Sequence, residues 1–245
     1  MNIALLPDRA VLEISGEDRL AFLQGLISND VTKVRADQAI WAALLTPQGK
    51  WLADFFLIAT GDVLLLDVEA GQLAMLAQRL GRFRLRAKVA LRDASADWRV
   101  YAAWGEGAPP EGLTARDPRL PEAGWRVLAP AGLPTNASAE DYAAHRLALG
   151  LPDGSKDMEA EKSVLLEGGF DELNGISWTK GCYMGQELTA RTRYRGLLKR
   201  RLVPVAIEGP APERGTPIMT PDGAEAGEMR SSQGAQGLGQ LEQHG

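Results

Sequence analysis

The sequence predicts a protein of the α+β class, in which strands and helices follow one another in no regular order. Short apolar or alternating segments predict strands, and segments with apolar residues at every third or fourth position predict helices. A strand, a turn and a second strand between residues 40 and 59 predict an antiparallel hairpin. The sequence has no sustained repeat and no heptad pattern, which argues against a solenoid or a coiled coil.

The first predicted elements are a strand at Val11–Ile14 and a helix at Glu17–Ile27, where apolar residues recur at helical spacing. The hairpin follows, with strands at Ile40–Leu45 and Trp51–Ala59. The sequence TPQG at 46–49 joins them, with proline and glycine at the positions that a type I turn favours. These segments therefore predict a strand, a helix and a two-stranded hairpin in that order.

A strand at Val63–Val68 and a helix over residues 70–80 come next. From Arg82 to Arg92 basic and apolar residues alternate, which predicts a half-buried strand with a strongly positive outer face. Strands are also predicted at Trp98–Ala103 and Trp125–Ala129. Between them, four glycines and four prolines at 105–124 predict a loop.

A last helix is predicted from residue 138 onward. Ser138 and Asp141 have the spacing of a capping box, in which each side chain accepts a hydrogen bond from the other residue's backbone N–H. The helix should stop at Gly150, because glycine followed by Pro152 ends a helix.

Composition and charge exclude several functional classes. The chain has 245 residues, 45% of them hydrophobic, which is enough for one large domain or two to three small ones. Its net charge of −5 argues against a protein whose whole surface binds nucleic acid. The chain has no apolar run of about 18 residues and no signal-peptide pattern at its start. These features predict no membrane association and a cytoplasmic location.

Few residues of this chain could ligate a metal. The single cysteine, Cys182, excludes an internal disulfide. The only histidines, His145 and His244, leave too few ligands for a structural zinc site. We therefore predict no metal site from this chain alone.

The segment from Lys180 to Arg201 is the most informative for function. It contains seven basic residues and one acid, a local positive region in an acidic protein. Cys182 lies between two glycines, shortly before an expected helix start at Gln186. A helix N-terminus and nearby cations, with Lys180 among them, stabilise a thiolate, so a reactive cysteine is predicted. The alternative is a small buried cysteine beside a solvated basic face.

The sequence KGCYMGQE, followed by ARTRYRG, resembles the signature of the YgfZ-type folate-binding proteins. These are relatives of the aminomethyltransferase of the glycine cleavage system (GcvT). Four further segments resemble the family: ISGEDRLAFLQGLISND, LTPQGKWLADFFL, HRLALGLPDG and GTPIMTPDGAEAGEMRSSQG. The resemblance covers most of the chain and is weaker from about Arg82 to Ala137.

The resemblance implies a GcvT-like, ring-shaped arrangement of two ferredoxin-like α+β units and a C-terminal β-barrel. Residues 1–38 and 137–195 would form a discontinuous folate-binding domain, residues 39–136 a second α+β domain, and residues 196–245 the barrel. The sequence ends at GLGQLEQHG, where relatives continue through further strands. The barrel is then either truncated, with an exposed edge strand, or naturally shorter.

The resemblance also assigns residues to a tetrahydrofolate site. Asp54 corresponds to the aspartate that aminomethyltransferases place beside the reacting nitrogen of the folate. Tyr142 corresponds to an aromatic residue of the folate pocket, and Arg146, one helical turn later, could pair with the glutamate tail. Arg9 stands where some relatives have tryptophan, so cation stacking could replace a ring contact. Each of these side chains could instead be an ordinary strand or helix residue.

The function implied is that of a folate-binding accessory factor for assembly or repair of iron-sulfur proteins, with an effect on tRNA modification through enzymes that carry such clusters. Its partners would be folate and iron-sulfur assembly proteins or client enzymes. Cys182, which aminomethyltransferases lack in this motif, and the absence of their N-terminal arm favour the accessory factor, while enzymatic turnover is left open.

Two alternatives remain at this point. The first is a tetrahydrofolate-dependent aminomethyltransferase or methyltransferase that uses Asp54. The second is an RNA-binding module that uses the two basic segments, which is less favoured because only Tyr183 and Tyr194 are available there for stacking on bases.

Overall fold

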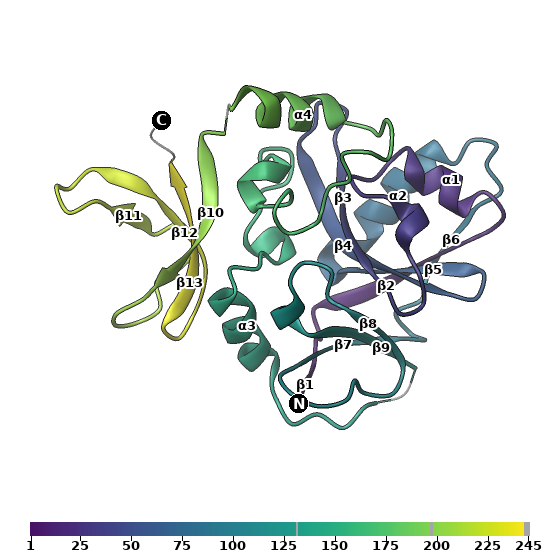
Figure 1. Cartoon of the computed structure of the whole chain (residues 1–245), viewed down its shortest axis with the longest axis horizontal. Coiled ribbons are helices and arrows are strands. Elements are labelled where there is room, and N and C mark those ends of the chain that lie inside the picture. The colour runs from purple at the N-terminus through teal and green to yellow at the C-terminus, as the bar shows by residue number, and fades with distance from the viewer. Residues whose placement is uncertain (131, 197, 243–245) are drawn as a thin grey trace.

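The computed structural model describes residues 1–130, 132–196 and 198–242, and its strands form three antiparallel sheets (Figure 1). The largest sheet has five strands, in the order β3 (Ile40–Leu45), β4 (Trp51–Thr60), β5 (Val63–Glu69), β2 (Arg9–Ser15) and β6 (Ala90–Asp93). The second sheet has four, in the order β1 (Asn2–Leu5), β7 (Arg99–Trp104), β9 (Trp125–Ala129) and β8 (Leu113–Arg116).

The third sheet comes from the C-terminal part of the chain and lies at one end of the molecule (Figure 1). Its order is β10 (Arg200–Ala206), β13 (Gln236–Glu242), β12 (Glu225–Gln233) and β11 (Pro217–Met219). Within residues 198–242 this sheet is open, with β10 and β11 as its edges. The helices are α1 (Arg19–Gln24), α2 (Leu73–Phe83), α3 (Ala139–Ala148) and α4 (Gln186–Arg195).

Short 3-10 turns complete the chain. They are η1 (Val31–Lys33), η2 (Ala70–Gln72), η3 (Pro121–Ala123), η4 (Gly154–Lys156) and η5 (Leu165–Gly168). Helix α3 contacts β1 of the second sheet on one side and β12 and β13 of the third sheet on the other. Strand β10 also contacts η5, so α3 and η5 both join the C-terminal sheet to the rest of the molecule. No helix among the described residues has both the length and the hydropathy needed to cross a bilayer.

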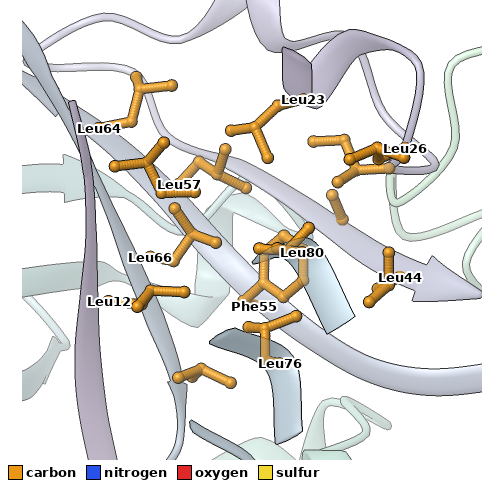
Figure 2. Packing of buried hydrophobic residues seen from close by; sticks show 14 of the residues in the cluster. Leu12, Leu23, Leu26, Leu44, Phe55, Leu57, Leu64, Leu66, Leu76 and Leu80 are labelled. Carbon is orange, nitrogen blue, oxygen red and sulfur yellow. The ribbon is translucent and has the colours of Figure 1, made fainter. Parts of the chain in front are cut away.

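The five-stranded sheet is buried on both faces, which is why its central strands are almost continuously apolar. One face packs against α1 and α2, as Figure 2 shows. The main contributors are Leu12, Leu23, Leu26, Leu44, Phe55, Leu57, Leu64, Leu66, Leu76 and Leu80. On the opposite face, Ile58 and Leu65 pack against the second sheet, while Trp41 stacks on Phe170 with 3.8 Å between ring centroids.

Most of the predicted elements are confirmed. The hairpin strands, the strands near 11, 63, 98 and 125, and the helices that begin near 70, 138 and 186 all form. Ser138 and Asp141 make both capping-box hydrogen bonds at the start of α3, at 3.1 and 2.8 Å. The predicted helix at 17–27 is shorter than expected, because only Arg19–Gln24 is α-helical.

The predicted strand from Arg82 to Arg92 is wrong over most of its length. Helix α2 continues to Phe83, and Leu85 adopts a left-handed conformation with φ of 42°, which interrupts an extended backbone. Only Ala90–Asp93 forms a strand, which pairs with β2. The predicted loop at 105–124 also contains a short edge strand, β8.

Strand pairing connects the segments 1–38 and 39–136 of the chain. Strand β2, from the segment 1–38, pairs with β5 and β6 of the segment 39–136. Strand β1 pairs with β7 of that same segment. Residues 137–195 contribute α3, α4 and two 3-10 turns but, among those described, no strand to a sheet with residues 1–38. Backbone pairing thus joins the N-terminal segment to both sheets of the middle segment.

Candidate functional site

A cluster of buried charges lies where the five-stranded sheet, the second sheet and α3 meet. Arg9 of β2 donates from Nε to Oδ1 of Asp67 on β5, at 2.6 Å. Arg126 of β9 lies over the ring of Phe56 at 4.2 Å, with its Nη1 atom 3.4 Å from Oδ2 of Asp67. Because these side chains are buried, their charges depend on one another rather than on water.

A second ion pair extends this cluster. The guanidinium of Arg119 donates to Asp117 with two short hydrogen bonds, of 3.0 Å from Nε and 2.7 Å from Nη2. Burial disfavours the charged carboxylate, but Arg119 and Arg126 together hold the pKa of Asp117 below its ordinary value. The carboxylate therefore stays ionised and paired.

Asp54 on β4 is almost fully enclosed, with 3% of its surface exposed. Its carboxylate accepts hydrogen bonds from the indole N–H groups of Trp41, at 2.9 Å, and Trp51, at 3.2 Å. Burial raises the pKa of Asp54 to about 6, although the Trp41 hydrogen bond and the charge of Arg9 act in the opposite direction. Asp54 is therefore a buried hydrogen-bond acceptor that links the indole groups of Trp41 and Trp51.

Tyr142 and Arg146 lie one turn apart on α3 and are both buried. The hydroxyl oxygen of Tyr142 accepts a hydrogen bond from Nη2 of Arg126 at 3.0 Å. Arg146 donates to Oδ2 of Asp157 at 2.8 Å and to Oγ of Ser231 on β12 at 3.1 Å. The resemblance implied that Arg146 pairs with the carboxylate of a folate glutamate tail. In the structure, the carboxylate of Asp157 occupies that role.

A small cavity lies beside these groups. Tyr142, Arg146, Arg9, Arg126 and Asp153 are among its lining residues, and its volume is about 40 Å³. Asp54 does not line it, so the structure brings together two of the three predicted folate residues. Arg9 is among the charges that act on the Asp54 carboxylate and thus connects it electrostatically to the cavity.

This cavity does not fit tetrahydrofolate. Sites for small organic molecules usually have volumes of about 300–1,000 Å³. The cavity volume of about 40 Å³ suits a few water molecules, and the polar side chains around it already pair with one another. A folate would have to displace buried ion pairs, so no chemical step is assigned to it.

Cys182 lies in a different place, on the loop that precedes α4, and its side chain is exposed. Lys180, two residues earlier, donates from Nζ to the backbone carbonyls of Ile27 at 2.7 Å and Asn29 at 2.8 Å. Burial lowers the pKa of Lys180 to about 8. Lys180 thus anchors the loop to residues 27–29, and the thiol itself faces solvent.

The loop of Cys182 is also held from the other side. Gly185, the N-cap of α4, has a φ of 80° and lies against the hairpin turn. A Cβ atom at Gly185 would come within 2.5 Å of the carbonyl oxygen of Thr46. The backbone N–H of Met184 donates to the carbonyl of Gly25 at 3.0 Å. The thiol is therefore presented by a fixed backbone rather than by a free loop.

Sequence reasoning missed the buried partners Asp67, Arg119, Arg126 and Asp157 and the half-buried Asp153. Two of them could have been recognised in the sequence, because Asp67 and Arg126 are charged residues within otherwise apolar strand sequences. A charged residue in a strand expected to be buried predicts a buried ion pair. The other three lie outside the regular elements and give no such signal.

No group of three or more His, Cys, Asp or Glu side chains suited to a metal ion occurs in residues 1–130, 132–196 and 198–242. His145 contacts the backbone carbonyl of Glu122 at 3.1 Å. His244 lies outside the described residues.

The fold defines the class of protein: an α+β chain with the fold of aminomethyltransferase T, whose C-terminal sheet matches a β-barrel domain family. The crystal structure of glycine cleavage system aminomethyltransferase T from Bartonella henselae is similar with a TM-score of 0.74, covering 98% of this chain and 78% of that one. Sequence identity is 12%, so this similarity shows the fold alone. Residues 199–242 match the family described as CAF17, C-terminal beta-barrel domain. The predicted GcvT-like fold is thus confirmed.

Sequence relatives identify the family. The chain is 36% identical over 231 residues to "Iron-sulfur cluster assembly factor IBA57 homolog, mitochondrial" of Mycosarcoma maydis, which covers 84% of this chain and 57% of the relative. It is 33% identical over 273 residues to "Iron-sulfur cluster assembly factor IBA57, mitochondrial" of Mus musculus, covering 96% of this chain and 76% of the relative. The chain therefore belongs to the IBA57 family of iron-sulfur cluster assembly factors.

These relatives correct two expectations. The predicted YgfZ-type family is confirmed only in its broader form, an iron-sulfur assembly factor with a GcvT-like fold. The predicted cytoplasmic location is contradicted, because the relatives from Mycosarcoma maydis, mouse and human are all named as mitochondrial proteins.

Proposed function

We propose that this protein acts in iron-sulfur cluster assembly by presenting the thiolate of Cys182 as one ligand of a cluster that it shares with a partner protein. The observation that carries this proposal is the position of Cys182, the chain's single cysteine, exposed on the loop that precedes α4. Iron-sulfur clusters are usually held by four cysteine thiolates. Three ligands must then come from an assembly protein or a client enzyme, and the cluster is cargo rather than a resident cofactor.

The fixed backbone around Cys182 supports this role. Lys180, Met184 and Gly185 tie the loop to residues 25–29 and to the hairpin turn. A cysteine on a rigid backbone loses little conformational freedom when its sulfur binds a metal cluster. An effect on tRNA modification would follow indirectly, through client enzymes that need their clusters.

A tetrahydrofolate-dependent transferase is less well supported. That activity would need Asp54 beside a bound folate, whereas Asp54 is enclosed by two tryptophans and does not line the small central cavity. Tetrahydrofolate binding therefore stays a prediction of the sequence resemblance. It can be tested separately by calorimetric titration of the purified protein.

Complementation with Cys182→Ser tests the proposal. The variant should fold, because the side chain is exposed and the change in volume is small, yet it should fail to restore iron-sulfur enzyme activity in cells that lack their own protein of this family. Thr179→Ala, at a position three residues away, is the matched control and should restore activity fully. Full rescue by a folded Cys182→Ser protein would overturn the proposal.

A further inference from the structure

A groove lies between residues 177–183 and α4, directly beside Cys182. Its volume is about 240 Å³. The two residues that flank Cys182 in the sequence both line it. Its apolar lining is formed by Trp178, Tyr183, Ala190 and Tyr194. A groove of this size is below the range of small-molecule sites and matches one or two side chains of a bound polypeptide.

The surface around this groove is aromatic and carries three arginines of α4, against one acidic lining residue, Glu187. Tyr194 is 75% exposed and meets Trp178 edge-on, with 6.4 Å between the ring centroids. The guanidinium of Arg193 lies 4.0 Å from the Trp178 ring, and Arg191 and Arg195 of the same helix are exposed. No ion pair holds these three arginines among the described residues, which leaves their charge available to a partner.

A polar group inside the groove also lacks a partner. Ser177 is 8% exposed and lines the groove, and no described residue forms a hydrogen bond with its hydroxyl. A buried hydroxyl without a partner is unfavourable, so a ligand that supplies one gains binding free energy. A backbone carbonyl or N–H of an extended peptide could satisfy it.

We propose that this groove binds an acidic segment of the partner protein, with one bulky apolar side chain in the groove and flanking carboxylates on the arginines of α4. The inference rests on the proposed function, because it assigns the partner's contact surface beside the shared cluster. Arginine and aromatic residues are the types most enriched where proteins bind one another tightly. Carboxylates have the opposite charge to Arg191, Arg193 and Arg195, which form no ion pair with a described residue. The two oxygens of a carboxylate can also accept two parallel hydrogen bonds from one guanidinium.

Single-stranded RNA fits this surface less well. RNA of this kind binds by stacking successive bases on exposed aromatic rings. Arg193 covers Trp178 and Tyr183 is buried, which leaves Tyr194 as the one largely exposed ring of the groove among the described residues. A single stacking position beside a groove favours a peptide.

The test is fluorescence polarisation with the full chain and a labelled peptide that has one phenylalanine between two pairs of aspartates. The peptide should bind, and Arg193→Glu should weaken binding at least tenfold. Arg86→Glu, at an exposed arginine near the end of α2, is the matched control and should change binding less than twofold. Replacing the peptide's phenylalanine with serine should also weaken binding at least tenfold.

Three outcomes would overturn the proposal: no binding at millimolar peptide, equal effects of Arg193→Glu and Arg86→Glu, or tighter binding of a labelled ten-nucleotide uridine RNA that Arg193→Glu abolishes. No cluster takes part in this assay, and Cys182→Ser should bind the peptide like the wild type. Failure of the peptide assay therefore refutes only the proposal that the groove binds a peptide. Full rescue by Cys182→Ser refutes only the proposal that Cys182 is a cluster ligand.

Discussion

Arginines occur in two contrasting regions of this protein, the buried charge cluster at its centre and the surface around Cys182. In the centre, Arg9, Arg119 and Arg146 each pair with a carboxylate of the same chain. Beside Cys182, Arg191 and Arg193 are exposed, and no described residue forms an ion pair with them. The difference shows that charge alone does not mark a functional site. The surface region differs from the centre because no described carboxylate pairs with its arginines.

The largest effect on stability should come from the centre. Arg146→Ala leaves Asp157 buried without its cation, and such a loss typically costs about 3–5 kcal/mol in the free energy of unfolding. Arg191→Ala, at an exposed site, should change it by less than about 0.5 kcal/mol. Urea denaturation measures the free energy of unfolding of both variants. Equal losses in the two variants would contradict the contrast between the buried and the exposed arginines.

The next largest effect should depend on pH through Asp54. Because burial raises its pKa from 3.8 to about 6, the native state holds this proton more tightly than the unfolded chain. Protonation of Asp54 stabilises the native state fully only well below pH 3.8, and this stabilisation is lost as the pH rises through 6. Each tenfold difference in proton affinity corresponds to roughly 1.4 kcal/mol, so the full effect is about 3 kcal/mol, of which about 2.4 kcal/mol is lost between pH 4 and 7.

Asp54→Asn removes this titration. The free energy of unfolding of the variant, relative to the wild type, should therefore rise by about 2.4 kcal/mol between pH 4 and 7. Asn keeps one acceptor for an indole N–H, so a constant offset between the two proteins is expected in addition. Urea denaturation at pH 4, 5, 6 and 7 measures this, and parallel curves for both proteins would refute the assignment.

The smallest effect should come from Cys182. Cys182→Ser should change the free energy of unfolding by less than about 0.5 kcal/mol, because the side chain is exposed. Iodoacetamide should alkylate the native protein within about threefold of the rate of the urea-unfolded chain, because the exposed side chain is open to the reagent in both states. Strong protection in the native state, measured by mass spectrometry, would place Cys182 in the interior and remove the contrast.

The sequence predicted the regular elements well where a local rule applied. The TPQG turn, the capping box at Ser138 and the apolar strands of the first sheet each carry their own signal, and all three form. The alternating segment from Arg82 misled because charged residues at every second position also fit a helix end and an exposed turn. The pairing of β1 and β2 with different sheets depends on contacts distant in sequence, which no local pattern reports.

The candidate site was predictable in part for a similar reason. Cys182 and the basic segment after it were identifiable from the sequence alone, and the structure places both at the surface. The proposed folate residues were assigned by resemblance, and the structure joins Tyr142 and Arg146 in one small cavity without Asp54. Their pairing with Arg126 and Asp157 could not be predicted, because these partners come from other parts of the chain.

The close contact between the hairpin turn and the start of α4 has an evolutionary consequence. Gly49 and Gly185 both have positive φ angles, and a methyl group on Gly49 would lie 2.6 Å from the carbonyl oxygen of Gly185. Neither position has room for a side chain unless the other backbone moves. Substitutions at the two sites should therefore covary among homologues. The second glycine of the KGCYMGQE motif is then required by its contact with the hairpin turn, 136 positions earlier, whatever the role of the thiol beside it.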